Sequence, residues 1–420
     1  MQLKQIFLTK VFLLGFIIRL ILMPFSGHYD IRGINFAVHN LPFNKELNVY
    51  DVACCKDIDY LVKVNFGRDY FIYPPLTYFT LGTFMWILKP LYGNEFVTWI
   101  NGFGNDVLSV LTHPYVFRYM FFMKLPYLIF DILLVVILRE FFVKRGDKHR
   151  VMKYWWLNPI VIFLPYVWGQ FDIIPTAFTV LGVLAATKNR SVTAAVLFGI
   201  AASFKNYPLM LLPLIAVVLG KNLAGMFRTF FLGLAPFIFT TLPYWGHEFF
   251  RKTVLFSWQS QKMLDFLWAI GGDDGIYPFV IGYFLIFLWT LYSLRGQNQL
   301  LPLPIVSVLM WYYATTNFHQ QWFLWVLPFL TLYAVSDKRI RLIGIWVIAL
   351  FFLRLLEIQA NVTTEMFVWL APAVEDLPKS RAILGSLYDI HKLRNLVNSA
   401  FMATAVFLIH YTWTARHKKV

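Results

Sequence analysis

Apolar runs close to the length of a bilayer recur from one end of this chain to the other. A helix needs roughly 20 apolar residues to cross about 30 Å of hydrocarbon. Because 59% of the 420 residues are hydrophobic and only 14% are charged, the sequence predicts an all-α polytopic membrane protein. The candidate runs are residues 6–24, 73–91, 115–138, 154–167, 173–187, 191–204, 207–220, 226–243, 276–295, 300–316, 322–335, 341–356 and 396–413.

Clusters of lysine and arginine predict the orientation, because such clusters are retained on the cytoplasmic side. All of these clusters fall on the same side of the membrane only if residues 73–91 form a juxtamembrane helix, along or partly in the outer leaflet, without a net crossing. That leaves about 12 transmembrane helices with both termini cytoplasmic, and 18 of the 22 acidic residues then fall outside. The net charge of +15 therefore reflects topology, and no nucleic-acid partner is expected. The clusters lie at 139–153, 188–190, 221, 295, 338–341 and 416–419.

Three long outer segments, residues 25–114, 244–275 and 357–395, carry aromatic and mixed charged residues rather than Gly/Ser repeats. They are expected to be ordered caps on a single integral membrane domain spanning residues 1–420. The chain is expected in a cytoplasmic (inner) or endoplasmic reticulum membrane, with membrane lipids as partners. No Gly-rich phosphate loop, HExxH motif or Cys/His metal spacing occurs, so no cofactor is expected to be required and no metal ligand is assigned.

Two acids at the outer membrane surface are candidates for chemistry. Asp30 follows the first span, where it could act as a general base or cap a helix over residues 31–38. Asp172 follows Trp168-Gly169-Gln170-Phe171 at the entrance to a span with Pro175 in its first turn, so it could cap that helix, take part in a site, or do both.

Two outer turns carry polar residues between apolar runs. Lys205 could neutralise a lipid phosphate or simply extend its ammonium to the interface. His319, Gln320 and Gln321 suit sugar hydroxyls or phosphate, and they equally suit an exposed turn without a role. Tryptophans at span ends, Trp322 and Trp325 among them, are interpreted as interfacial belts.

Ionisable residues inside the spans predict buried pairs. Asp131 is favoured as an interhelical hydrogen-bonding residue over a proton relay, and Lys124 lies seven residues earlier on roughly the same face. Arg354 and Glu357, three residues apart near a span end, are expected to form an intrahelical pair.

The order of several short motifs resembles the GT-C superfamily of polyprenyl-phosphate-sugar-dependent glycosyltransferases, particularly its mannosyltransferase-like branches. The resemblance covers roughly residues 1–335. The motifs are Asp30 after the first span, Tyr73-Pro74-Pro75-Leu76, Lys124-Leu125-Pro126 with Asp131, Asn158-Pro159, Trp168-Gly169-Gln170-Phe171-Asp172, Lys205-Asn206-Tyr207-Pro208 with Leu211-Leu212-Pro213, and His319-Gln320-Gln321 before Leu327-Pro328.

The resemblance implies a site on the luminal or periplasmic face that moves a sugar, mannose being favoured, from a polyprenyl or dolichyl monophosphate carrier to an acceptor hydroxyl with inversion. The acceptor could be a lipid, a glycan or a protein. Many family members have a second acid beside the first-loop Asp, and this chain has none beside Asp30, which weakens the case for a divalent metal. The expected catalytic residues are Asp30 and Asp172, and the expected substrate-binding residues are Lys205, Tyr73, Gln170, Tyr207, His319 and Gln320.

Two other functions remain compatible with the sequence. A secondary transporter would also have about 12 spans, although transporters usually place ionisable residues near the bilayer midplane and often consist of two similar halves. A non-catalytic membrane protein that binds lipid-linked sugars would use the same residues as an enzyme.

Overall fold

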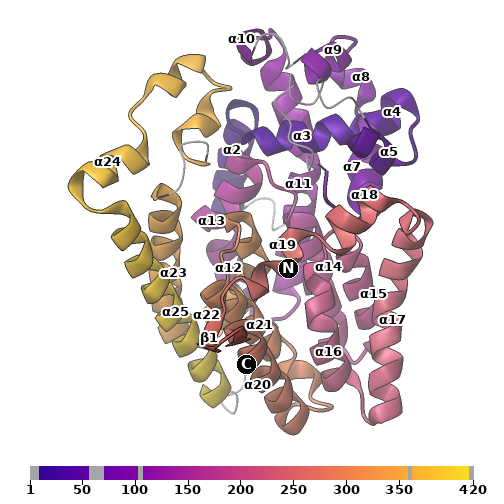
Figure 1. Cartoon of the computed structure of the whole chain (residues 1–420), viewed down its shortest axis with the longest axis vertical. Coiled ribbons are helices and arrows are strands. Elements are labelled where there is room, and N and C mark those ends of the chain that lie inside the picture. Colours follow the sequence, from indigo (N-terminus) through magenta and orange to yellow (C-terminus); the bar gives the residue numbers. More distant parts are fainter. Residues whose placement is uncertain (1–8, 56–70, 103–106, 358–361, 416–420) are drawn as a thin grey trace.

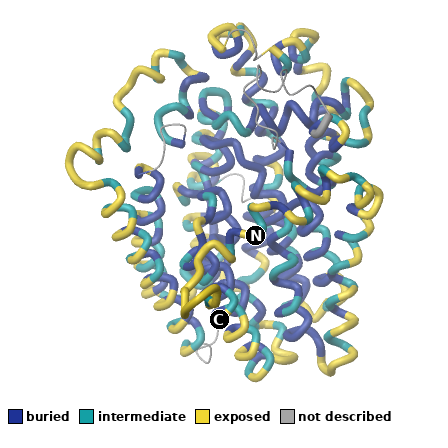
Figure 2. Tube along the Cα trace, in the orientation of Figure 1, coloured by how far each residue is buried: buried dark blue, intermediate teal, exposed yellow. Residues whose placement is uncertain are grey.

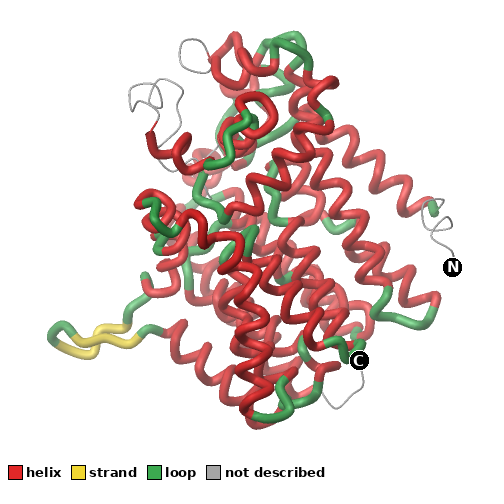
Figure 3. The backbone as a smooth tube through the Cα atoms, turned by 90° about the vertical axis from the view of Figure 1, so that its right-hand side faces the viewer, coloured by secondary structure: helices red, strands yellow, loops and turns green. Residues whose placement is uncertain are grey.

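A computed structural model of the whole chain describes residues 9–55, 71–102, 107–357 and 362–415. Nearly all of the described structure is helical, and the helices pack side by side beneath a cap of short helices (Figure 1). One two-stranded antiparallel hairpin, β1 (Trp268–Gly271) and β2 (Asp274–Ile276), extends away from the bundle (Figure 3). The predicted all-α class is therefore right apart from this hairpin.

The first outer segment is a series of short helices at one end of the bundle. Its described part follows the first long helix, α2 (Lys10–Phe25), while residues 56–70 and 103–106 lie outside the described residues. These helices are α3 (Tyr29–Val38), α4 (Asn40–Asn44), α5 (Val49–Cys55), α7 (Pro75–Ile87), α8 (Lys89–Tyr92), α9 (Phe96–Asn101) and α10 (Val107–Leu111).

The middle of the chain forms the helical bundle. Its members are α11 (Val116–Arg139), α12 (Arg145–Val151), η2 (Met152–Trp156), α13 (Pro159–Ile162), η3 (Phe163–Trp168), α14 (Ile173–Thr187), α15 (Ser191–Ala202), α16 (Tyr207–Leu219) and α17 (Leu223–Thr241). The second outer segment adds η4 (Leu242–Tyr244), α18 (Glu248–Phe250), η5 (Arg251–Leu255), α19 (Trp258–Gln261) and η6 (Lys262–Leu264) before the hairpin.

The last third of the chain completes the bundle. It contains α20 (Pro278–Ser293), η7 (Asn298–Leu300), α21 (Pro302–Thr315), η8 (Gln320–Trp325), α22 (Leu327–Ser336) and α23 (Lys338–Leu356). The third outer segment, of which residues 358–361 lie outside the described residues, leads into the last long helix. These elements are η10 (Thr364–Phe367), η11 (Pro372–Asp376), α24 (Ser380–Leu387) and α25 (Ile390–Thr414).

Three described helices are long and apolar enough to cross a membrane: α11, α17 extended through η4, and α25. A fourth span is possible if α2 is counted together with residues 29–44, although a bend of 79° separates the two. The expected number of about 12 spans is not reached, because the other apolar helices contain only 10–17 residues. At about 1.5 Å per residue, such helices fall short of about 30 Å of hydrocarbon.

Prolines and backbone irregularities shorten these helices. The run predicted over residues 154–167 is broken into the π-helical η2, the short α13 and the π-helical η3, with Pro159 starting α13 and Pro165 inside η3. Proline lacks the backbone N–H that a continuing helix needs, so a hydropathy average cannot reveal such a break.

Many large apolar residues of the bundle are exposed. Figure 2 shows exposed positions along the outer helices. On α17 the side chain of Phe239 is 82% exposed, and on α20 Phe284, Leu288 and Trp289 are also exposed. A monomer in water rarely presents contiguous apolar surface on this scale. Hydrocarbon is the solvent that suits this surface, which supports a membrane protein.

The basic turns that the sequence assigns to one side of the membrane contact one another. Arg295 donates to the carbonyl oxygen of Lys221 at 3.1 Å, and Arg150 donates to that of Val335 at 3.1 Å. The hydroxyl of Tyr411, near the end of α25, donates to Asp337 at 2.7 Å. Each of these hydrogen bonds joins two turns or helix ends that are distant in the sequence.

Asp131 is held inside the bundle by side chains from three other elements. Arg19 on α2 donates to Asp131 at 2.9 Å, Trp155 on η2 at 2.8 Å and the Tyr166 hydroxyl on η3 at 2.8 Å. All four side chains are buried. The favoured interpretation of Asp131 as an interhelical hydrogen-bonding residue is therefore confirmed, but its charged partner is Arg19 and not Lys124.

Lys124 instead binds the carbonyl ends of two helical segments. Its Nζ donates to the carbonyl oxygens of Met23 (2.9 Å), Tyr166 (2.8 Å) and Ser26. Met23 and Ser26 lie at the C-terminal end of α2 and Tyr166 lies near the end of η3, where carbonyl groups lack intrahelical partners and carry partial negative charge. One ammonium thus links the C-terminal ends of α2 and η3.

The expected intrahelical pair between Arg354 and Glu357 is not formed. The guanidinium of Arg354 donates to the side chain of Asn398 on α25 at 2.8 Å. Both carboxylate oxygens of the buried Glu357 lack hydrogen-bond partners among the described residues. The pairing rule fails here because α25 packs beside α23 and offers Arg354 a partner closer than its own helix does.

Replacing Lys124 with Met should loosen the outer ends of α2 and η3. The change removes the donor from the carbonyl oxygens of Met23 and Ser26 and leaves that of Tyr166 with only the Ser26 hydroxyl, at roughly 1–3 kcal/mol for each unsatisfied group. Hydrogen exchange should accelerate in residues 22–30 and 164–170 and stay unchanged in α14 and α15. Equal acceleration throughout the bundle would show that Lys124 has no such local role.

Candidate active site

A cavity of about 920 Å³ opens between the outer cap and the bundle. Its polar part includes Asp30, Lys205, Asn206, Gln259 and His319, and its apolar part includes Leu209, Met210, Met263, Val280 and Phe284. Phe284 lines the apolar part and is itself 57% exposed. The remaining lining residues are Tyr29, Gly33, Ile34, Ile72, Tyr73, Pro74, Tyr207, Leu255, Ser257, Ser260, Phe279, Tyr283, Tyr312, Gln321, Trp322 and Trp325.

Asp30 reaches the cavity from the first turn of α3. The helix is capped by His28, whose Nδ1 accepts from the backbone N–H of Asp30 at 3.1 Å, so the Asp30 carboxylate is not the cap. Instead, the Asp30 carboxylate accepts from Nε2 of Gln170 at 2.8 Å and lies 3.1 Å from Nδ1 of His28. Its side chain is 43% exposed although it lies deep in the molecule, because that exposure is to the cavity.

The surroundings of Asp30 keep it ionised. Burial favours the neutral acid, but the neighbouring His28 and the hydrogen bond from Gln170 outweigh burial, and the pKa of Asp30 is lowered. A carboxylate that faces an open space and has a lowered pKa can accept a hydrogen bond from a bound hydroxyl at neutral pH.

Close contact between two segments fixes Gln170 beside Asp30. Gly169 has φ +90°, and a Cβ at this position would lie 2.9 Å from Cδ1 of Ile31 on α3. The backbone N–H of His28 donates to the carbonyl oxygen of Trp168 at 2.8 Å. Only glycine allows both this backbone conformation and this approach, so the turn before Gln170 brings its amide to the carboxylate.

Asp172 and Lys205 form a buried ion pair. Nζ of Lys205 lies 2.8 and 2.9 Å from the two carboxylate oxygens of Asp172, and Nε1 of Trp325 donates to Asp172 at 2.6 Å. Asp172 occupies the N-cap position of α14, but its side chain makes no capping hydrogen bond. The capping interpretation is therefore wrong for both acids, and Asp172 itself does not line the cavity.

Lys205 faces the cavity with its charge already paired. Burial lowers the pKa of Lys205, and Asp172 and Asp30 oppose that effect. The Nζ atom also lies 5.2 to 5.4 Å from the ring centres of Phe171 and Tyr73. A Lys205 that serves a lipid phosphate would have to share its ammonium with Asp172.

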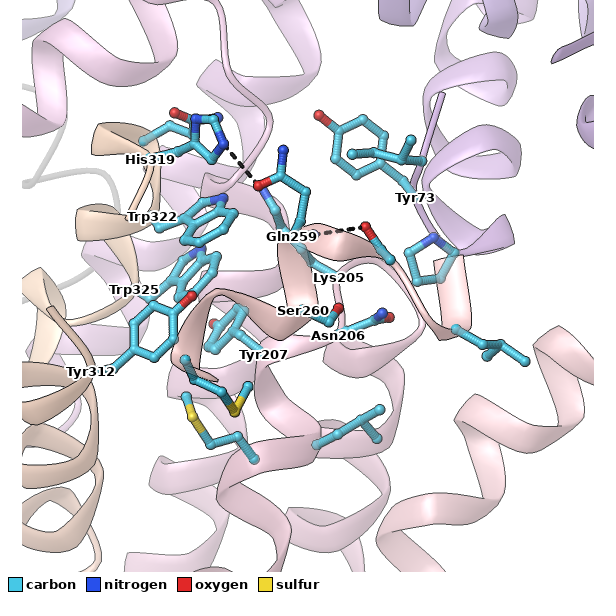
Figure 4. A pocket seen from close by; sticks show the side chains of 18 of the residues that line it. Tyr73, Lys205, Asn206, Tyr207, Gln259, Ser260, Tyr312, His319, Trp322 and Trp325 are labelled. Carbon is cyan, nitrogen blue, oxygen red and sulfur yellow. Dashed lines mark hydrogen bonds between the residues drawn. The ribbon is translucent and has the colours of Figure 1, made fainter. Parts of the chain in front are cut away.

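An aromatic wall lines one side of the cavity, with Tyr73 on the other (Figure 4). Ring centres are 5.0 Å apart for His319 and Trp322, 5.4 Å for Trp322 and Trp325, and 4.1 Å for Trp325 and Tyr207. His319, Trp322 and Trp325 share one face because η8 is a 3₁₀ helix, in which residues three apart are eclipsed, while Tyr207 comes from α16. The wall offers flat apolar surface beside polar groups, as pockets for amphipathic ligands do.

The two tyrosines of the predicted site differ in whether their hydroxyl can bind a ligand. Burial, and then the charges of Asp30 and Asp172, raise the pKa of Tyr73 well above its usual value, so its phenol stays protonated. The hydroxyl of Tyr207 is hydrogen-bonded to the Thr179 hydroxyl at 2.8 Å. Tyr73 can therefore donate to a ligand, whereas Tyr207 contributes chiefly its ring.

His319 contacts two polar side chains of the second outer segment. Its Nε2 lies 2.9 Å from Nζ of Lys262 and 2.8 Å from Oε1 of Gln259. Burial, reinforced by the positive charges of Lys262 and Lys205, lowers the pKa of His319 to about 4. The imidazole is therefore neutral at physiological pH.

The structure brings most of the predicted site residues together. Asp30, Tyr73, Lys205, Tyr207 and His319 line one cavity, with Gln170 and Asp172 bonded directly to lining residues. Gln320 is different: it is buried and does not line the cavity, because the 3₁₀ turn points it off the aromatic face.

Sequence reasoning missed several lining residues. Trp322 and Trp325 were assigned to an interfacial belt, yet both line the cavity and Trp325 binds Asp172. The three-residue spacing of His319, Trp322 and Trp325 is the signal that could have found them. Gln321 also lines the cavity, whereas no motif marks Gln259 in the second outer segment.

Within the described residues, no group of three or more His, Cys, Asp or Glu side chains could hold a metal ion. No protein-family model matches this chain, and no curated protein matches it either. The site must therefore be interpreted from its own geometry.

Replacing Lys205 with Ala should destabilise the protein markedly, because it leaves Asp172 buried without its cation. Removal of one partner of a buried pair typically costs about 3–5 kcal/mol. Lys205→Arg should retain much of the stability, since a guanidinium also binds a carboxylate through two hydrogen bonds. Thermal unfolding of the purified variants would measure both effects. A Lys205→Ala protein as stable as the wild type would show that the pair is not formed.

Proposed function

We propose that this chain is an inverting glycosyltransferase that moves a sugar from a polyprenyl-phosphate carrier to an acceptor hydroxyl on the non-cytoplasmic face of a membrane. The observation that carries the proposal is a single cavity with an ionised, accessible carboxylate at its polar part and an apolar part lined by Met210, Met263 and the exposed Phe284. A lipid-linked sugar combines a polar head and an apolar chain in the same way.

The dimensions of the cavity suit such a donor. Its volume of about 920 Å³ lies within the usual range of about 300–1,000 Å³ for small-ligand sites. Sugar and phosphate would lie beside Asp30, Tyr73 and the aromatic wall, while the first prenyl units would follow Met210, Met263 and Phe284 outward. The rest of the prenyl chain would remain in the bilayer.

Asp30 is the general base of this mechanism. The acceptor oxygen attacks the anomeric carbon from the face opposite the phosphate, and its proton passes to the Asp30 carboxylate. The bond between the anomeric carbon and the phosphate oxygen breaks, and its electron pair leaves with the phosphate. Because a phosphate monoester is a stable anion, one carboxylate suffices, whereas an inverting hydrolase needs an acid as well.

The Asp172–Lys205 pair shapes the site rather than performing the proton transfer. Asp172 has no exposed surface and is saturated by Lys205 and Trp325, so it is poorly placed to accept a proton from a substrate. In this mechanism the pair fixes the positions of Lys205 and the aromatic wall around the sugar. Asp172 is thus a positioning residue.

The order of the motifs supports membership of the GT-C superfamily, with mannose as the favoured sugar. Under this proposal the cap and the cavity face the periplasm or lumen, and the basic turns and both termini face the cytoplasm. A transporter or a non-catalytic binding protein would share the cavity but would not need an accessible ionised carboxylate at its polar part.

The variant Asp30→Asn should bind the donor but lose transfer. An amide keeps the shape and can still accept from Gln170, but it cannot take up a proton, and general base catalysis is typically worth about 10²- to 10⁴-fold in rate. Because the pKa of Asp30 is lowered, the acid limb of the wild-type pH profile should lie below the usual range of a carboxyl group. Radiolabelled polyprenyl-phosphate sugars, with protein in lipid nanodiscs, would measure transfer.

Asp51→Asn is the matched control, because Asp51 is an exposed acid of the first outer segment paired with His247 at 2.9 Å. Its transfer rate should equal that of the wild type. If Asp30→Asn keeps more than about a tenth of the wild-type rate, Asp30 is not the base. Donor binding without transfer by the wild type would favour the binding protein over the enzyme.

Labelling of single cysteines should place the two ends of the fold on opposite sides of the membrane. After Cys54 and Cys55 are replaced by Ala, a cysteine at Arg145 should react with a membrane-impermeant maleimide only from the cytoplasm. Cysteines at Gly246 and Ser380 should react only from outside. Reaction of positions 145 and 380 from the same side would refute this topology.

A further inference from the structure

Three side chains meet at the wall of the cavity where α19 and η6 approach η8. Lys262, Gln259 and His319 form what we call the Lys262 cluster. Gln259 and His319 line the cavity, as Figure 4 shows, and the buried ammonium of Lys262 lies directly behind them. Of the three residues, only His319 is among the site residues predicted from the sequence.

Hydrogen bonding within the Lys262 cluster is incomplete in any arrangement. If Nε2 of His319 accepts a hydrogen bond from Lys262, the lone pair of Nε2 also faces the Oε1 acceptor of Gln259. If Nε2 instead donates to Gln259, the Nε2 proton faces the ammonium of Lys262. Turning the Gln259 amide places two donors on one lone pair. The three side chains hold more N–H donors than acceptors, so an added group rich in acceptor oxygens would satisfy the cluster.

Lys262 also lacks a salt bridge among the described residues. Among the described residues, no carboxylate lies within 4 Å of its Nζ, in contrast to Lys205, which is paired with Asp172. The rings of Trp258 and Trp322 lie 4.8 and 5.6 Å from the ammonium. Burial lowers the pKa of Lys262, and the nearby charge of Asp265 opposes that effect. Lys262 is therefore the cation at this cavity without a salt bridge.

The proposed reaction needs such a cation. The carrier is a phosphodiester with one negative charge while it holds the sugar. It leaves as a monoester whose second ionisation, with a pKa of about 6, brings its charge close to two. Lys205 cannot fully meet this added charge, because Asp172 already neutralises it. A preorganised cation near the departing oxygen stabilises the charge as it develops.

We propose that the Lys262 cluster binds the phosphate of the prenyl carrier and offsets the negative charge that this phosphate gains as the sugar departs. The proposal rests on the proposed function, and it assigns the second outer segment to recognition of the phosphate. His319 and Gln259 supply hydrogen bonds from the cavity wall, and Lys262 supplies the charge behind them. Lys205 then orients the sugar and its phosphate without carrying the main charge interaction.

Prenyl monophosphate and the matching alcohol provide the test, because they differ only in the phosphate. Purified protein in nanodiscs is titrated with geranylgeranyl phosphate and with geranylgeraniol. The wild type should prefer the phosphate, and Lys262→Met should lose about 10- to 100-fold in affinity for the phosphate with the alcohol unaffected. Lys262→Arg should recover most of the preference, which separates loss of charge from loss of fold.

The matched control is Lys252→Met, which removes an exposed lysine of the same outer segment that pairs with Glu248. It should bind both ligands as the wild type does. The proposal is wrong if Lys262→Met keeps the preference for phosphate, if the wild type has none, or if Lys252→Met reduces it equally.

The outcomes also distinguish failure of the Lys262 cluster proposal from failure of the proposed function. If Lys262→Met loses phosphate binding while the wild type transfers no sugar, the Lys262 cluster stands and the proposed function fails. If Asp30→Asn abolishes transfer while Lys262→Met binds the phosphate normally, the proposed function stands and the Lys262 cluster fails.

Discussion

The buried ion pair between Asp172 and Lys205 is the interaction on which the cavity depends. It joins the start of α14 to the turn between α15 and α16, and through the indole of Trp325 it reaches η8. These segments are distant in the sequence, and the turn at Lys205 and η8 both line the cavity. A buried pair is stable only when its geometry satisfies both charges, so the position of each wall is tied to the others.

The two acids of the site differ because their environments differ. Asp172 is enclosed and fully bonded, while Asp30 is open to the cavity and supported by one amide and one imidazole. Such separation of environments is how proteins give two carboxylates two tasks. The turn at Gly169 places the Gln170 amide that supports the Asp30 carboxylate.

The sequence predicted the largely helical class of fold and several residues that line the cavity, since hydropathy and the positions of acids and lysines are local properties. The number of spans was not predictable in this way, because Pro159, Pro165 and the π-helical turns shorten helices without lowering hydropathy. The partner of Asp131 and the place of Lys262 depend on contacts between distant segments. Gln320 was wrongly predicted to bind substrate, because a turn was expected where a 3₁₀ helix forms.

The 3₁₀ geometry of η8 also makes this stretch sensitive to chain length. Each residue of a 3₁₀ helix turns the chain by about 120°, so a single insertion between His319 and Trp325 would rotate every later side chain by a third of a turn. Trp325 would leave Asp172, and another residue would take its place in the wall. Related chains that keep this cavity should therefore vary in the identity of the residues here but conserve their number.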